Sequence, residues 1–295
     1  MADVPDAVGC AGATSAEDPS PPGGPSDDER SSQYIVQLKR PIPDELKYEM
    51  DPTKRGKCFI FNCESFDRLD PSSKRLGSEK DAAAIEALFK SLGYNPETFK
   101  DCTIKEMEEK LQAVAKDDSN RSVDSFVCTL LSHGKYGKIW AKDGLIKLQD
   151  LFQSFTESTT GHLQEKPKIF FVQACQGTDE EHDPNADGEW SYDIQSHPHL
   201  FVGFATPPGF LSWRNTKEGS CYIQRLCKIF DASITEDDAS SPDLETLTVA
   251  VNRNLSFTFE SFVPSKDELH MKKQTSCLFS TLTKKVVFTK KPIAK

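Results

Sequence analysis

The sequence predicts an α/β fold in which helices cover both faces of a mostly parallel sheet. From about residue 57 onward, apolar runs of strand length alternate with amphipathic stretches of helix length. The runs are apolar at nearly every position, as expected of strands that are buried on both faces. With 295 residues, of which 37% are hydrophobic, the chain can bury a core for one large domain or two small ones.

Five apolar runs are expected to form strands, at residues 57–62, 125–134, 168–177, 200–209 and 277–289. Two of these runs end in residues that can carry out chemistry. One ends at Ser132-His133-Gly134, and another contains Cys175 close to its end. In sheets of this type, functional sites form beyond the carboxyl ends of the strands. The two ends therefore predict a site.

The amphipathic stretches predict helices at residues 78–93, 103–116, 147–156, 219–232 and 242–259. We expect Ser78 to cap the first helix and Gly93 to end it. Thr103 and Glu106 have the spacing of a capping box, and Pro242 fits the first turn of the last helix.

The net charge of −10 is concentrated in two segments. Residues 1–33 carry −6 and residues 179–193 carry −7, so the rest of the chain carries +3. The first segment is also rich in proline and glycine, which predicts a disordered tail of 30 to 45 residues. The second is either an ordinary surface loop or a linker with a function. We expect no binding of nucleic acid, because the chain has no basic patch.

No apolar run reaches 18 residues and no signal sequence precedes the first helix, so we expect neither a membrane span nor secretion. The nine cysteines are odd in number and scattered, which predicts reduced thiols in the cytosol. The sequence contains no C-x-x-C pair, and its six histidines lack zinc-finger spacing. We therefore expect no structural metal site.

Cys175 and His133 form a candidate catalytic pair. A thiolate is a strong nucleophile, and a nearby histidine can take the thiol proton and pass it to a leaving amine. Gly134 and Gly177 beside them leave room for a substrate backbone. Either residue alone has a more ordinary explanation, because a cysteine after a strand is most often a small buried apolar residue.

Several short sequence motifs, which occur in a particular order along the chain, identify a family. They are LLSHG at 130–134, FFVQACQGT at 170–178, SWRNTKEGS at 212–220, YIQRLC at 222–227 and KKQTSC at 272–277. With these motifs the chain resembles the caspases, cysteine proteases that cut after aspartate, and is most similar to the short-tailed executioner type. The resemblance covers about residues 45–289.

The resemblance implies a three-layer α/β/α sandwich around a mostly parallel six-stranded sheet. Two copies would join their last strands into a continuous twelve-stranded sheet. It also implies four segments: a disordered short prodomain at 1–44, a large catalytic subunit at 45–178, a cleavable acidic linker at 179–193 and a small subunit at 194–295.

The resemblance further implies a precursor that is activated by cleavage in the linker, by an upstream caspase or by the protein itself. Asp187 is the expected cleavage site, because the small Gly188 follows it. Asp183 precedes a proline, and Asp179 lies too close to the catalytic loop. Asp18 and Asp28 are both possible sites for removal of the tail.

The family's site residues transfer to matching positions of this sequence. Cys175 matches the nucleophile, His133 matches its partner, and the N–H groups of Cys175 and Gly134 match the oxyanion hole. The pocket for the substrate aspartate and the surface for the neighbouring residues are matched by Arg75, Gln173, Arg214, Ser212, Trp213 and Asn215. Arginine suits such a pocket, since its planar guanidinium binds a carboxylate through two hydrogen bonds.

Three positions and one loop depart from the family pattern. Leu211 and Cys221 stand where aromatic residues are common, which predicts a roomier apolar pocket for the residue before the substrate aspartate. Gln176 replaces the arginine of many executioners, and the loop 262–270 lacks an aromatic that shapes the distal subsite.

The function implied by the resemblance is therefore that of a cytoplasmic endopeptidase of protein substrates that takes part in apoptosis. Its chemistry would proceed through a thioester, with no metal or cofactor. One alternative is an inactive homologue that regulates other caspases by binding them. Another is a relative that cuts after lysine or arginine, which would need an acidic pocket in place of Arg75 and Arg214.

Overall fold

A computed structural model describes residues 7–8, 44–155, 161–177, 198–264 and 269–291. Its centre is a six-stranded sheet in the order β12-β9-β8-β4-β2-β3. These strands are β2 (Lys57–Asn62), β3 (Asn95–Lys100), β4 (Phe126–Leu131), β8 (Lys168–Gln173), β9 (Leu200–Phe204) and β12 (Cys277–Ser280). All neighbours run parallel except β12, which is antiparallel to β9. The prediction of a mostly parallel sheet is confirmed.

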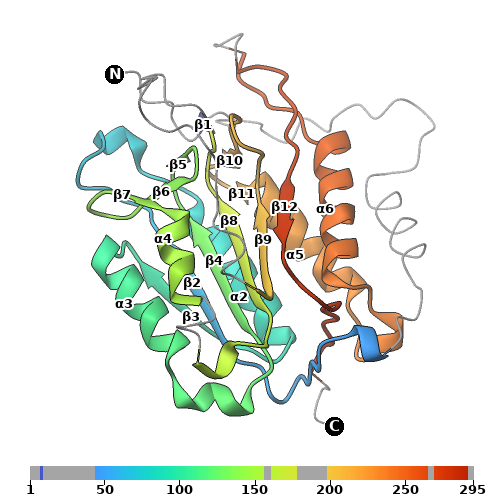
Figure 1. Ribbon diagram of the computed structural model, residues 1–295. Coiled ribbons are helices and arrows are strands. Elements are labelled where there is room, and N and C mark those ends of the chain that lie inside the picture. Colours follow the sequence, from blue (N-terminus) through green and yellow to red (C-terminus); the bar gives the residue numbers. More distant parts are fainter. Residues whose placement is uncertain (1–6, 9–43, 156–160, 178–197, 265–268, 292–295) are drawn as a thin grey trace, which may run out of the picture.

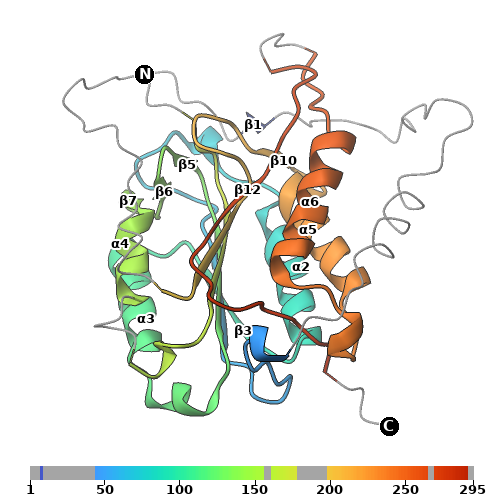
Figure 2. The ribbon, with the colours of Figure 1, turned by 45° about the vertical axis from the view of Figure 1, so that its right-hand side comes forward.

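Helices cover both faces of this sheet. The α-helices are α2 (Ser78–Ser91), α3 (Ile104–Ala115), α4 (Leu148–Phe152), α5 (Cys221–Ser233) and α6 (Leu244–Thr258). Figure 2 shows α3 and α4 on one side of the sheet and α2, α5 and α6 on the other. The three-layer arrangement expected from the sequence is therefore present (Figure 1).

The strands are apolar throughout because each face of the sheet has its own core. In β8, Ile169 and Phe171 pack among residues of α2, α5 and α6. The alternate residues Phe170 and Val172 pack with α3 and α4. All four side chains are fully buried, and each stabilises the fold by about 1.5–3 kcal/mol relative to an exposed position.

The ends of the helices confirm two expectations and correct two others. The Thr103–Glu106 capping box begins α3, and Gly93 follows α2 in a left-handed conformation with φ 90°. The expectation that Ser78 caps α2 is wrong, because Gly77 is the cap residue and Ser78 is the first helical residue. Pro242 likewise lies outside α6, where Asp243 caps the helix through its side chain.

Four of the five expected strands end earlier than predicted. The runs 125–134 and 168–177 leave the sheet after Leu131 and Gln173, where the chain turns toward the site. The run 200–209 ends at Phe204, and the run 277–289 leaves the sheet at Ser280. Apolar residues continue past these ends because Val286 and Phe288 pack against the helices, without pairing in the central sheet.

The sequence reading missed β3 and every short strand outside the central sheet. β3 is an edge strand of polar sequence, NPETFK, and it pairs only with β2. The short strands form two further sheets, one of β5 (Gly134–Lys135), β6 (Lys138–Trp140) and β7 (Leu145–Lys147), the other of β1 (Ala7–Val8), β10 (Trp213–Asn215) and β11 (Gly219–Ser220). Strands of two or three residues give no periodic signal that a sequence could show.

Short 3-10 helices connect these elements, at Asp44–Leu46, Pro71–Ser73, Asp118–Ser122, Gln153–Phe155, Gly161–Leu163 and Asp238–Ser240. The expected helix 147–156 is thus α4 followed by one of these turns. Across the described residues, every helix is too short or too polar to cross a lipid bilayer.

Candidate active site

The pairing of β4 with β8 brings His133 and Cys175 to the same place. The register sets Leu131 opposite Gln173, and the backbone N–H of Ser132 donates to the carbonyl of Gln173 at 3.0 Å. His133 and Cys175 each come two residues after this last pair. Because neighbouring strands lie about 4.8 Å apart, two side chains at equal offsets from a common register meet beyond the sheet.

His133 is held by contacts on its other side. Its ring nitrogen Nε2 lies 2.6 Å from the carbonyl oxygen of Ser73, so Nε2 must carry the proton of this hydrogen bond. The ring of Phe66 packs against it at a centroid distance of 5.0 Å. In the neutral imidazole this arrangement makes Nδ1 the nitrogen that can accept a proton.

Cys175 lies between Ser212 on one side and Gly134 on the other. The backbone N–H of Ser212 is 3.4 Å from the sulfur. A Cβ atom at position 134 would lie 2.7 Å from the carbonyl oxygen of Cys175 and 2.9 Å from the Cβ of Ala174. Only glycine permits this approach, which brings the backbone of Gly134 against the cysteine.

The side chain of Gln176 ties the cysteine loop to the loop that follows the histidine. Its Oε1 accepts a hydrogen bond from the backbone N–H of Gly137 at 3.0 Å, and its own backbone N–H donates to the carbonyl of Phe210 at 2.9 Å. Gln176 is fully buried. The loop that carries Cys175 is thus fixed from two directions.

Arg75 and Arg214 are both buried beside this pair, with exposed fractions of 0% and 1%. Arg75 donates from Nη1 to the carbonyl of Cys63 at 3.1 Å, and Arg214 donates from Nη1 to the carbonyl of Leu76. Gln173 is also fully buried, and its Nε2 donates to the hydroxyl of Ser212 at 3.0 Å. Two buried guanidinium groups give this cluster a positive charge, which suits an anionic ligand.

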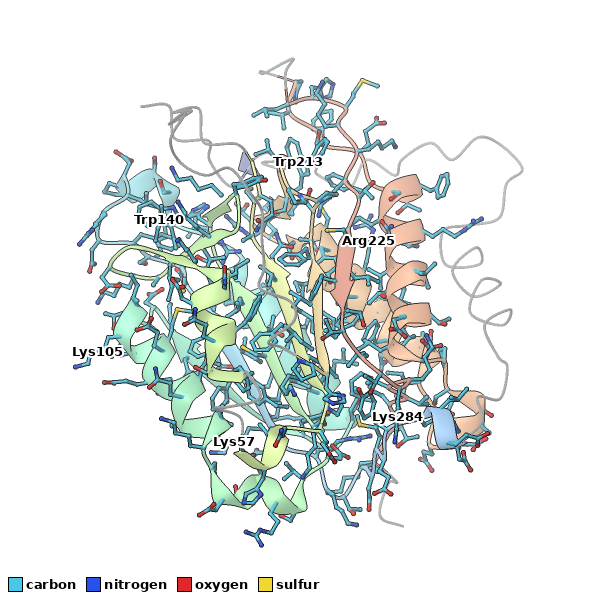
Figure 3. The ribbon with its side chains drawn as sticks, in the orientation of Figure 1. Lys57, Lys105, Trp140, Trp213, Arg225 and Lys284 are labelled. Atoms are coloured by element: carbon cyan, nitrogen blue, oxygen red, sulfur yellow. The ribbon has the colours of Figure 1, made fainter. Side chains whose placement is uncertain are left out.

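Strand β10 borders the cluster and can pair with an extended chain. The segment Ala7–Val8 pairs with Trp213 and Arg214 in a parallel register. The Trp213 backbone N–H donates to Oε1 of Gln274 at 2.9 Å, and this hydrogen bond helps to hold the strand in place. Figure 3 shows Trp213 and Trp140 at the same end of the sheet, far from Lys57 at the start of β2.

The remaining predicted substrate-binding residues also lie at this end of the sheet. A Cβ atom at Gly177 would be 3.7 Å from Cδ2 of Leu211, so Leu211 lies beside the cysteine loop. Asn215 Oδ1 accepts the N–H groups of Lys217 and Glu218, which shapes the turn from β10 to β11. Cys221 is the first residue of α5 and packs against the core on the α2 side of the sheet. Asp187 lies outside the described residues.

Four other thiols of the described residues are poor nucleophiles. Burial raises the pKa of Cys63 to about 12 and that of Cys277 to about 11, and it also raises the pKa values of Cys58 and Cys128. These groups are thiols at neutral pH. Across the described residues, no cluster of three or more histidine, cysteine or acidic side chains has the arrangement of a metal site.

Sequence reasoning missed several residues that hold the site together. The carbonyl of Ser73, the ring of Phe66 and the side chain of Gln274 contact the predicted residues across long stretches of sequence, so no local pattern marks them. Asp81 is different, because it is an acid on the buried face of α2, one turn before Ile85. A charged residue on an apolar face is a signal that the sequence does contain.

Comparison with known proteins gives one answer. Residues 55–287 match the caspase domain family. The chain is 34% identical to Caspase-1 of Drosophila melanogaster over 99% of its own length and 90% of the relative's, and 34% identical to Caspase-3 of Bos taurus over 83% and 88%. The crystal structure of Caspase-1 from Spodoptera frugiperda superposes with a TM-score of 0.72 at 31% identity, covering 86% of this chain and 98% of that one. The chain therefore belongs to the caspase family of cysteine endopeptidases.

Proposed function

We propose that this chain is an active endopeptidase that cuts protein substrates after aspartate. The observation that carries the proposal is the buried pair Arg75 and Arg214 next to Cys175 and His133. Two permanent positive charges near the nucleophile select a carboxylate, and they disfavour a lysine or arginine in the same place. An inactive regulatory homologue would have no need to keep the nucleophile, the histidine and both arginines.

In the proposed complex the substrate adds an extended strand to β10, in the place that Ala7–Val8 takes in this structure. Main-chain hydrogen bonds with the carbonyl of Ser212 and the backbone of Arg214 give affinity that does not depend on side chains. The aspartate side chain enters between Arg75 and Arg214, with Gln173 as a further hydrogen-bonding partner. The backbone carbonyl carbon of the same aspartate then lies next to the Cys175 sulfur.

The chemistry needs only groups of this chain and water. His133 accepts the proton of the Cys175 thiol, and the sulfur attacks the carbonyl carbon. Backbone N–H groups of Cys175 and Gly134 stabilise the negative oxygen that forms. His133 then protonates the leaving amine, which breaks the peptide bond and leaves a thioester. A water molecule attacks the thioester, restores the thiol and releases the acid product.

The family and the relatives support a role in apoptosis, and we place the reaction in the cytoplasm. We propose that the protein is made as a precursor, with a prodomain at 1–44, and that an upstream caspase or the protein itself cuts the linker at 179–193.

The first prediction concerns substrate choice. Wild type should hydrolyse a fluorogenic peptide that ends in aspartate and leave the matching asparagine peptide uncut. Cys175→Ala should abolish turnover. Arg214→Ala should lower kcat/KM for the aspartate peptide by about 100-fold or more, because a buried charged hydrogen bond is lost. The measurement is initial rate against peptide concentration. No turnover by wild type, even after forced cleavage at residue 187, would favour the regulatory homologue.

The second prediction concerns the residue that precedes the substrate aspartate. With Leu211 and Cys221 in place of aromatic residues, we propose that this subsite accepts larger apolar side chains. A peptide library that varies this position should show higher kcat/KM for leucine or valine than for alanine. Leu211→Tyr should reverse that order, since the ring would fill the space. A wild-type profile that favours alanine contradicts the proposal.

The third prediction concerns activation. Cleavage after Asp187 should give fragments of roughly 20 and 12 kDa, from the average mass per residue of the chain. Asp187→Ala should remove these two bands on gel electrophoresis, while the neighbouring Asp183→Ala leaves them in place. If both variants give the wild-type fragments, Asp187 is not the site.

The fourth prediction concerns assembly. Strand β12 is the last strand of the central sheet, and its Leu278 is 41% exposed. An apolar edge strand favours pairing with a second copy, which would give the twelve-stranded sheet. Leu278→Asp should shift the sedimentation of the cleaved enzyme from dimer to monomer, because it places a charge at that edge. Leu46→Asp, at a position 54% exposed, is the control and should remain dimeric.

A further inference from the structure

The two arginines of the pocket come from opposite sides of the acidic linker in the sequence, and one contact surface joins them. Arg75 lies three residues before α2, and Arg214 lies on β10. Arg214 reaches the carbonyl of Leu76, just before the helix. A Cβ atom at Gly77 would lie 2.6 Å from the carbonyl oxygen of Thr216 and 2.8 Å from that of Asn215. The start of α2 therefore packs directly on the turn from β10 to β11.

Asp81 crosses the same contact surface from the first turn of α2. Its Oδ1 accepts hydrogen bonds from the backbone N–H of Ser220 and from Nε2 of Gln224, both at 2.8 Å. Ser220 is the direct partner of Arg214 in the β10–β11 pairing. A Cβ atom at Gly219 would lie only 2.4 Å from the same oxygen, so the glycine makes room for the carboxylate.

Keeping a charged carboxylate at position 81 costs free energy of folding. The side chain is fully buried, and its second oxygen has no hydrogen-bond partner among the described residues. Burial raises the pKa of Asp81, while the bonds from Gln224 and Ser220 and the charge of Arg75 lower it. A buried acid with one unsatisfied oxygen is costly to keep, and here its bonds reach the hairpin that carries Arg214 while its charge acts on Arg75.

We propose that Asp81 is the positioning residue of the aspartate pocket: it holds the β10–β11 hairpin, and with it Arg214, against the segment that carries Arg75. Its negative charge also offsets part of the charge of the buried Arg75 guanidinium. This inference rests on the proposed function, since it concerns the pocket for the substrate aspartate. The pocket would then be formed by both predicted subunits, since Arg75 belongs to the large one and Arg214 to the small one.

If Asp81 had a purely structural role, its loss would lower stability without changing the preference for an aspartate peptide over an asparagine peptide. Asp81 accepts from the cap residue of α5, so its loss should destabilise the fold whatever it does for the pocket. Asp124 provides a matched control. It is also a buried carboxylate, paired with Arg55 at 2.7 Å, but it lies before β4, at the end of the sheet opposite to the site.

The test uses the Cys175→Ala protein, cut at a protease site inserted after residue 187, so that it binds peptides without turnover. Fluorescence polarisation gives Kd for the aspartate and asparagine peptides, and urea unfolding gives stability. Asp81→Ala should weaken binding of the aspartate peptide by about tenfold or more, as expected when charged hydrogen bonds are misplaced. Binding of the asparagine peptide should change far less. Asp124→Ala should lower the unfolding midpoint and leave the ratio of the two Kd values unchanged.

Asp81→Asn keeps an oxygen for Ser220 and Gln224 and removes the charge. If it restores the wild-type Kd ratio, the hydrogen bonds do the positioning; if it behaves as Asp81→Ala does, the charge does. Both outcomes support the role in the pocket. The inference is overturned if Asp81→Ala and Asp124→Ala both lower stability and neither changes the Kd ratio.

Turnover is measured in parallel on the protein that retains Cys175. Preferred binding of the aspartate peptide without hydrolysis would refute the proposed activity and leave the test of Asp81 intact. If the protein with Asp81 in place shows no preference for aspartate, the pocket itself is wrongly assigned and the inference falls with it.

Discussion

The parallel pairing of β4 with β8 is the constraint on which the rest of the structure depends. A slip of one residue would turn each strand over and exchange the residues that face its two cores. In β8 such a slip would exchange Phe171, which faces α2 and α5, with Phe170, which faces α3 and α4. The apolar faces therefore fix the register, and the register in turn fixes where His133 and Cys175 meet. Catalytic geometry here is a consequence of core packing.

The arginine pocket depends on a second kind of contact, between backbones. Gly77 and Gly219 both stand at positive φ, and a Cβ at either would lie within 3 Å of atoms across the contact surface. Such an approach lets backbone carbonyls and a carboxylate reach the guanidinium groups, which a buried cation requires. The pocket is thus built where α2 and the β10–β11 hairpin come closest.

Several of the unsatisfied polar groups lie close to the proposed site, while others, such as Oγ1 of Thr289, lie elsewhere. Within the described part of the chain, buried atoms with no hydrogen-bond partner include Oδ2 of Asp81, Oε1 of Gln173, Nε2 of Gln176 and Oγ of Ser78. Each such group costs about 1–3 kcal/mol. Proteins commonly carry this cost at binding sites, where the rest of the fold supplies the stability and the site stays ready for its ligand.

The sequence by itself determined the layered α/β class, the five apolar strands of the sheet, the capping box of α3 and, through its short motifs, the resemblance to a family. These are local signals, and periodicity, capping and composition act over a few residues. It could not reveal β3, because an edge strand pairs on one side only and NPETFK needs no apolar face. The apolar runs also predicted strands that are longer than those observed, since the apolar residues beyond the paired segments pack against other elements.

Only the tertiary structure decided how the site residues come together. Arg75 and Arg214 are 139 positions apart in the chain, and a hairpin of very short strands brings one to the other. Ser73, Phe66 and Gln274 became visible as neighbours of the site residues only through contacts across the fold. The physical reason is that such contacts depend on where whole elements pack. That is set by the core as a unit, so no single stretch of sequence records it.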